Sequence, residues 1–184
     1  MNILISGIII FFGIHLLPGL VKFRHKLITK LGETPYQGLF AVIALTGLIL
    51  IIYGKSESAF QPIYEPATWA THVAAVLMAL SFIFLASANL KSNIKRFTAH
   101  PMLWGVTFWS CAHLLANGDL ASLLLFASFG VYSLYDMHSA NKRGASRQQT
   151  RYPLTKDIIT IVAGLAGFGI FIFLHGYLFG VPAI

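Results

Sequence analysis

Long apolar runs, separated by short polar or Pro/Gly segments, make up most of this chain. Six runs stand out, at residues 3–20, 36–53, 67–90, 101–116, 120–138 and 157–179. A helix needs about 20 residues to cross a hydrocarbon layer of about 30 Å. The first, second, fifth and sixth runs fit this length well, the third is long, and the fourth is short. The pattern predicts an all-α bundle of six transmembrane helices.

The fourth run, 101–116, leaves two interpretations open. It ends at Asn117-Gly118-Asp119, so it forms a tight helical hairpin with the fifth run if it crosses the membrane. The alternative is an apolar core helix that does not cross. The placement of the basic residues favours crossing, because removing the fourth span would break the alternation of basic and non-basic connections.

Basic residues alternate between the connections. In chain order the six connections after the runs carry 4, 1, 3, 0, 5 and 0 of the 13 Lys and Arg residues. They are Lys22, Arg24, Lys26 and Lys30; Lys55; Lys91, Lys95 and Arg96; and Lys142, Arg143, Arg147, Arg151 and Lys156. Basic loops stay cytoplasmic, so we expect loops 21–35, 91–100 and 139–156 in the cytoplasm and both termini on the outer, periplasmic side. We expect loop 139–156 to be mobile and close to anionic lipid.

The composition agrees with a membrane protein. Of the 184 residues, 57% are hydrophobic and 10% are charged, against about 25% charged in a soluble domain. The single cysteine, Cys111, excludes a disulfide scaffold and a Cys-based zinc site. The net charge of +7 comes with neither a basic helix nor a stacking motif, so we expect no nucleic-acid partner. We expect one membrane domain over residues 1–184, with a first helix that is not a cleaved signal.

Five of the seven histidines fall inside the predicted membrane region or at its edge: His15, His72, His100, His113 and His175. An ionisable side chain there is costly, so each needs a partner or a purpose. Neutral imidazole is also the commonest ligand for a metal or haem iron. His175 is expected to be an interfacial anchor, whereas His72 and His100 remain open. His15 and His113, inside their runs, are the functional candidates.

One face of the fourth run suits a planar cofactor. Residues three or four apart share a side of a helix. The stripe is Met102, Gly105, Trp109, His113 and Asn117, with Ser110 at its border. Gly105 would leave room for a flat group and Trp109 could stack on it, although an ordinary helix contact would need the same pattern. Ala163, Gly164, Gly167 and Gly169 give the last run a small-residue face for close packing.

Several short segments resemble one family of membrane proteins. They are GIHLLP at 13–18, LGETPY at 31–36 with LF at 39–40, HPMLWG at 100–105, AHLLANGD at 112–119, PLTKD at 153–157 and GVP at 180–182. The chain as a whole resembles the NnrU family of bacterial membrane proteins, which shares ancestry with the plastid 15-cis-zeta-carotene isomerase. No P-loop, H-E-x-x-H, G-x-S-x-G or C-x-x-C-H motif competes with this resemblance.

The resemblance implies a cofactor and a setting. NnrU proteins are associated with nitrite and nitric oxide metabolism in denitrifying bacteria, which implies the inner membrane. The isomerase relative holds a b-type haem between two histidines that correspond to His15 and His113. Its cysteine three residues before the second ligand corresponds here to Ser110, with Cys111 one step away, so the ligand exchange of that isomerase is not expected. If haem is bound there, we expect Trp109, Asn117 and Asp119 to shape or tune the site, beside the space left by Gly105.

The topology constrains this ligand pair. His15 lies about twelve residues below the outer surface and His113 only a few, an offset on the order of 10–15 Å at 1.5 Å per residue. Joint ligation then requires tilted helices or a first run displaced outward. His72, His113 and His175 are better matched in depth, so His72 is the substitute ligand, with His100 as a further candidate.

Two functional hypotheses follow. The first is a membrane protein with non-covalent haem b on His15 and His113, acting in nitric oxide or nitrite metabolism or as a redox-dependent, isomerase-like protein on a small hydrophobic or gaseous ligand. The second is a cofactor-free accessory protein that helps to assemble or stabilise nitric oxide reductase. The presence or absence of a haem b spectrum separates them.

Overall fold

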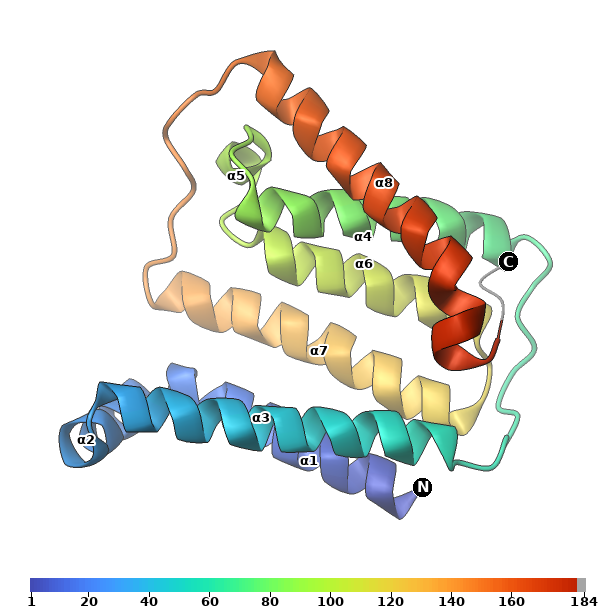
Figure 1. Ribbon diagram of the computed structural model, residues 1–184, viewed down its shortest axis with the longest axis horizontal. Helices are drawn as coiled ribbons and strands as arrows, with labels where there is room; N and C mark the ends of the chain where they lie inside the picture. The colour runs from blue at the N-terminus through green and yellow to red at the C-terminus, as the bar shows by residue number, and fades with distance from the viewer. Residues whose placement is uncertain (182–184) are drawn as a thin grey trace. The chain divides into compact units, whose positions relative to one another are not determined.

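The computed structural model describes residues 1–181, and its regular elements are helices (Figure 1). In chain order they are α1 (Asn2–Leu16), the 3-10 turn η1 (Leu17–Gly19), α2 (Val21–Leu31), α3 (Glu33–Ser56), α4 (Ala70–Asn89), α5 (Ile94–Phe97), α6 (Pro101–Ala116), α7 (Leu120–Lys142) and α8 (Leu154–Phe179). Each predicted run coincides with a helix, so the all-α prediction is confirmed.

Five helices are long and apolar enough to cross a membrane: α1 with η1, α3, α4, α7 and α8. The fourth predicted span, 101–116, is present as α6 with the predicted bounds, but it has 16 residues. At 1.5 Å per residue it is about 24 Å long, which is less than the hydrocarbon thickness of about 30 Å. The structure therefore gives five candidate spans, and a crossing by α6 stays a prediction.

Two helices, α2 and α5, occupy segments where the apolar pattern predicted only connections. We expected no basic helix, and α2 shows that this expectation is wrong, because it carries three lysines and one arginine. These basic residues leave no long apolar run within α2, so the apolar pattern did not predict this helix. Gly32 ends α2 with φ of 88°, a value that favours glycine, and Glu33 and Pro35 begin α3. This accounts for the LGETPY segment.

The described chain divides into two compact units, Met1–Tyr64 with Gly118–Ser128, and Glu65–Asn117 with Phe129–Ile184. The expected single domain over 1–184 stays a prediction. Pro182 of the GVP segment lies outside the described residues.

In the first unit, α1 and α3 form a closely packed hairpin. An added Cβ at Gly7 would lie 2.6 Å from the backbone nitrogen of Ile51, and one at Gly47 would lie 2.7 Å from that of Phe11. Gly54 meets the backbone of Leu4 in the same way. Lipid provides no hydrophobic force that drives helices together, so this backbone approach is what holds the pair.

In the second unit, α4 packs against both α6 and α8. The buried Ser81 hydroxyl donates to the Gly105 carbonyl oxygen of α6 at 2.8 Å. An added Cβ at Gly164 of α8 would lie 2.7 Å from the Cα of Ile83, and one at Gly167 would touch Phe82. The predicted small-residue face is therefore used at these two glycines, whereas Gly169 has open space beside it.

The long basic connection after α7 is tied to the loop before α5. The Asn93 side chain donates to Asp157 at 2.6 Å and to the Tyr152 carbonyl at 2.9 Å, and it accepts from the Tyr152 backbone N–H. The Gln148 backbone N–H donates to the Lys95 carbonyl. Against the expectation of a mobile loop, this segment is held by hydrogen bonds at several points.

We predict that the α1–α3 hairpin fails at Gly47→Ala and tolerates Gly38→Ala. Both replacements lie in α3 and gain the same helix propensity, about 1 kcal/mol, but only the Cβ at position 47 meets the neighbouring backbone. We expect Gly47→Ala to lose about 1–3 kcal/mol. Thermal unfolding in detergent, followed by circular dichroism, measures the difference, and equal midpoints for the two variants would contradict it.

Candidate functional site

His15 sits in the last turn of α1 with a fixed ring orientation. Its Nδ1 lies 2.6 Å from the Phe11 carbonyl oxygen, and its half-buried ring lies 4.2 Å from the Phe11 ring and 5.4 Å from the Phe40 ring. A carbonyl oxygen can only accept, so Nδ1 carries the hydrogen. In the neutral ring the lone pair is then on Nε2.

His113 has the same arrangement near the end of α6. Its Nδ1 lies 3.0 Å from the Trp109 carbonyl oxygen, so the hydrogen is again on Nδ1 and the lone pair of the neutral ring on Nε2. The Trp109 ring lies 5.0 Å from the imidazole, and Asn117 donates to the His113 carbonyl oxygen at 2.9 Å. Trp109 and Asn117 thus contact His113 from either side along the helix.

The remaining members of the α6 stripe face other helices or are exposed. Gly105 is buried, and an added Cβ would lie 2.8 Å from the Leu85 side chain of α4, so Leu85 fills the space beside this glycine. Met102 is exposed. Ser110 is buried near Gly130 of α7. Within the described residues, the part of the stripe gathered around an imidazole is therefore Trp109, His113 and Asn117.

The substitute ligands are placed less favourably than His113. His100 precedes His113 by thirteen residues, about 20 Å along α6, and its Nε2 is bonded to Asn141 Oδ1 at 2.7 Å. His72 is at the same end of the antiparallel α4–α6 pair as His113, but it is exposed, on the side of α4 opposite the buried Ala70 and Ala74.

His175 of α8 was expected at the interface, but its contacts were not predicted from the sequence. Its Nδ1 is bonded to the Val181 carbonyl oxygen at 2.7 Å, so it has the same tautomer as His15 and His113. It also lies close enough to His113 for the two imidazoles to interact electrostatically. The amino-acid pattern gave no signal for this proximity, because α6 and α8 are far apart in the chain and each packs on α4.

Asp119, just before α7, accepts hydrogen bonds from a lysine and from a backbone N–H group. Its carboxylate accepts from Lys55 Nζ at 2.9 Å and from the Ser122 backbone N–H at 3.0 Å, and its side chain is 7% exposed. Burial raises the pKa of Asp119, but the hydrogen bonds from Ser122 and Lys55 outweigh burial and hold the pKa below its ordinary value. The observed contacts of Asp119 are thus structural.

Next to Asp119, the connection 57–64 is fixed to the same turn. The Gly118 carbonyl oxygen accepts from the backbone N–H groups of Ile63 and Tyr64 at 2.8 and 3.1 Å. An added Cβ at Gly118 would overlap the Tyr64 carbonyl oxygen, so this position requires glycine. Gly118 and Asp119 therefore anchor the connection after α3.

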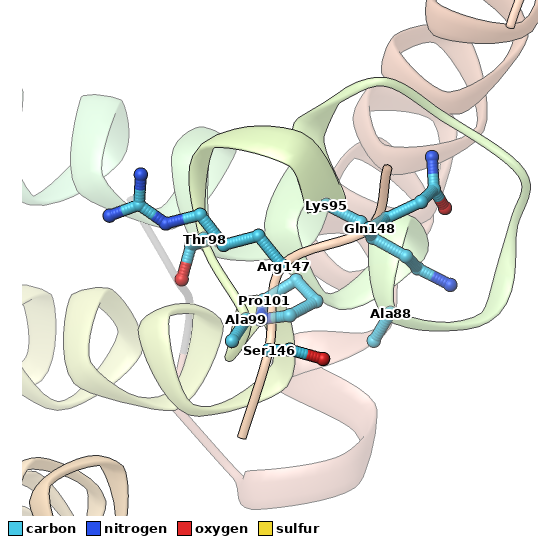
Figure 2. Close-up of a pocket in the computed structure, with 8 residues that line it drawn as sticks. All are labelled: Ala88, Lys95, Thr98, Ala99, Pro101, Ser146, Arg147 and Gln148. Carbon is cyan, nitrogen blue, oxygen red and sulfur yellow. The ribbon is translucent and has the colours of Figure 1, made fainter. Parts of the chain in front are cut away.

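The described residues contain no cluster of three or more His, Cys, Asp or Glu side chains suited to a metal ion. One cavity of about 370 Å³ lies near the start of α6 (Figure 2). Its lining residues are Ala88, Lys95, Thr98, Ala99, Pro101, Ser146, Arg147 and Gln148, and none of the predicted site residues is among them. Figure 2 shows the charged ends of Lys95 and Arg147 pointing to opposite sides, so they do not converge on one ligand.

A family model described as NnrU protein matches residues 3–183. The chain belongs to the NnrU family. No curated protein and no solved structure matches the chain. The family's match covers nearly the whole chain, so both histidine-bearing units fall within it.

The motifs that carried the resemblance have local physical roles. Pro18 follows directly on α1 within η1, Pro101 occupies the first turn of α6, and Gly118 and Asp119 form the turn anchored by Tyr64 and Lys55. His15 and His113 are the residues of these motifs whose ring tautomer is fixed by a backbone carbonyl four residues earlier.

We predict that Asp119→Asn removes a pH-dependent part of the stability. Because the pKa of Asp119 is lowered in the folded state, its contribution is present above the unfolded pKa of about 4 and is lost as the pH falls through the folded-state pKa. We expect a loss of about 1–3 kcal/mol at pH 7 and a flatter stability curve between pH 5 and 3. Thermal midpoints in detergent across this range test it.

The matched control is Asp136→Asn, since Asp136 pairs with Arg143 at 3.3 Å in a partly exposed position. An exposed pair contributes about 1 kcal/mol or less. If Asp136→Asn destabilised the protein as much as Asp119→Asn, the prediction that the Lys55–Asp119 contact contributes more to stability than an exposed ion pair would be wrong.

Proposed function

We propose that this NnrU family protein binds one non-covalent haem b with His15 and His113 as axial ligands through Nε2. The supporting observation is the Nδ1–H···O=C hydrogen bond at each residue, to Phe11 and to Trp109. Such a bond fixes the tautomer and the ring orientation and leaves the lone pair on the nitrogen that binds iron. Each histidine is assigned on its own contacts.

The neighbouring side chains have supporting roles in this proposal. Trp109 provides an aromatic ring 5.0 Å from the His113 ring, and Asn117 holds the carbonyl end of the helical turn that carries His113. Phe11 and Phe40 enclose the His15 ring with apolar surface. Apolar surroundings of this kind restrict water around a buried imidazole and its ligand.

Bound haem would supply a redox-active iron within the membrane. We propose that this iron acts in nitric oxide or nitrite metabolism of the bacterial inner membrane. An isomerase-like ligand exchange has less support, because the position three residues before His113 is Ser110, and Cys111 is exposed and about 100° around the helix from it.

We further propose six membrane crossings with both termini on the periplasmic side. The support is the alternation of basic loops at 21–35, 91–100 and 139–156, together with the three-residue turn between α6 and α7. The short α6 would cross with its ends close to the two interfaces, where polar caps such as Asn117 reach water.

We predict that protein purified in detergent from haem-replete cells shows a Soret band and the pyridine haemochrome of haem b. His113→Ala and His15→Ala are each expected to abolish the band, because each removes one of the two iron–nitrogen bonds. His25→Ala, on the exposed face of α2, is the control and should leave the spectrum unchanged.

His175→Ala decides which second ligand is used. His175 shares the tautomer and interacts with His113, yet the proposal expects no loss of haem when it is replaced. If His175→Ala lost the Soret band and His15→Ala kept it, the second axial ligand would be His175 in place of His15. A folded but colourless wild-type protein would reject haem binding and favour the cofactor-free accessory role for nitric oxide reductase.

We predict that a membrane-impermeant maleimide labels intact cells at Phe60→Cys and not at Ser146→Cys, with Cys111→Ser in both. Six crossings place residue 60 outside and residue 146 inside. If α6 did not cross, residue 146 would also lie outside, so labelling at both positions would overturn the six-span topology.

A further inference from the structure

Helix α2 has two chemically different sides. At 100° per residue its eleven residues divide into an apolar and a polar half. The apolar half holds Val21, Phe23, Leu27, Ile28 and Leu31, and the polar half holds Lys22, His25, Lys26, Thr29 and Lys30. Arg24 lies within the apolar sector, where its guanidinium is 5.8 Å from the centre of the Tyr36 ring.

The apolar half of α2 is not buried against other helices of its unit. No residue of α2 is buried, and Phe23 and Val21 are 53% and 58% exposed. Arg24 of α2 lies over the buried Tyr36 at the start of α3, and Leu27 and Ile28 of the apolar half are half-buried, whereas Val21, Phe23 and Leu31 are exposed. Exposed apolar side chains therefore flank this contact on both sides.

The direction of α2 relative to α3 indicates where this exposed surface lies with respect to the membrane. Figure 1 shows α2 nearly end-on where α3 is seen from the side, so α2 runs across the end of the α1–α3 hairpin. Both helices of that hairpin are candidate membrane spans. A helix that crosses the end of a membrane-spanning pair lies along the membrane surface.

The charge of α2 indicates what its polar half meets. Residues 21–32 contain Lys22, Arg24, Lys26 and Lys30 and no Asp or Glu. The ion pairs found among residues 1–181 are Lys55–Asp119 and Arg143–Asp136, so none of these four cations has a carboxylate partner there. A basic face beside an exposed apolar face is the pattern of a helix that binds an anionic lipid surface.

We propose that α2 is an interfacial helix whose lysines bind the headgroups of anionic phospholipids while Phe23 and Val21 enter the upper acyl region. The occupant of this surface is thus a lipid leaflet, and the proposal does not depend on haem. A second copy of the chain or an acidic protein would instead cover the apolar half and shield it from lipid.

Spin labels at single cysteines test the position of α2. The variants are Phe23→Cys, Lys26→Cys and Thr29→Cys in a Cys111→Ser background, reconstituted in vesicles of phosphatidylcholine and phosphatidylglycerol at 3:1. We expect position 23 to be more accessible to oxygen and positions 26 and 29 to a water-soluble nickel chelate. Equal accessibility at all three positions, or shielding of position 23 from both reagents, would overturn the proposal.

Charge removal tests the lipid preference. A fluorophore at Phe23→Cys in detergent-solubilised protein is titrated with short-chain phosphatidylglycerol or phosphatidylcholine. One lysine near an anionic surface contributes about a fivefold factor. Lys22→Gln, Lys26→Gln and Lys30→Gln together should therefore raise the half-saturating phosphatidylglycerol concentration on the order of a hundredfold.

The control removes three charges from the connection after α7, with Lys142→Gln, Arg147→Gln and Arg151→Gln. We expect it to change the half-saturating concentration by about twofold or less, since these residues lie outside α2. An equal change of the half-saturating concentration in both triple variants would show that net charge alone, and not the position of the lysines on α2, determines lipid binding. Equal binding of phosphatidylcholine would remove the anionic preference, and either result contradicts the proposal.

Discussion

Close approach of helix backbones is the constraint on which this protein depends. In lipid, apolar side chains gain no hydrophobic free energy from meeting one another, so helices associate by van der Waals packing where small residues let backbones come close. Gly7, Gly47 and Gly54 do this for α1 and α3, and Gly105 and Gly164 do it around α4. The outward faces of the same helices are apolar and exposed, as Ile9 and Val42 illustrate, which suits contact with acyl chains.

Polar contacts at the ends of helices fix the connections between the helices that the glycines bring together. Asp119 with Lys55 and the Gly118 carbonyl fix the connection after α3, and Asn93 with Asp157 fixes the connection before α8. These groups lie at or beyond the ends of the long apolar segments, where a hydrogen-bonded charge costs less than in the centre of the hydrocarbon layer. Asp119, which the haem hypothesis assigns to cofactor tuning, thus also has an architectural contact.

The histidines differ by which ring nitrogen the backbone holds. His15, His113 and His175 are bonded through Nδ1 to carbonyl oxygens, whereas His100 is bonded through Nε2 to Asn141. The first arrangement suits an iron ligand, because it orients the ring and leaves the lone pair on Nε2. This distinction gives the haem proposal a physical basis beyond the number of histidines.

The sequence alone determined the helices and their approximate ends. Apolar runs of membrane length, ended by Pro18, Pro101 and the Asn117–Asp119 turn, predict helices because lipid satisfies no backbone polar group outside the chain. It also selected His15 and His113, since an imidazole inside an apolar run is costly. The basic helix α2 escaped this pattern, because eleven residues with a lysine or arginine at almost every second position form no apolar run.

Only the tertiary structure decided what each polar or small residue contacts. Gly105 was expected to leave room for a cofactor, yet Leu85 of another helix fills that room. The role of Asp119 near a ligand stays a prediction, and its observed partner is Lys55, 64 residues away. His175 was expected at the interface, at a depth similar to that of His113, but its hydrogen bond with the Val181 carbonyl oxygen was not expected. Helical periodicity fixes which residues share a face, but the neighbour of that face depends on packing between segments distant in the chain, which no local pattern encodes.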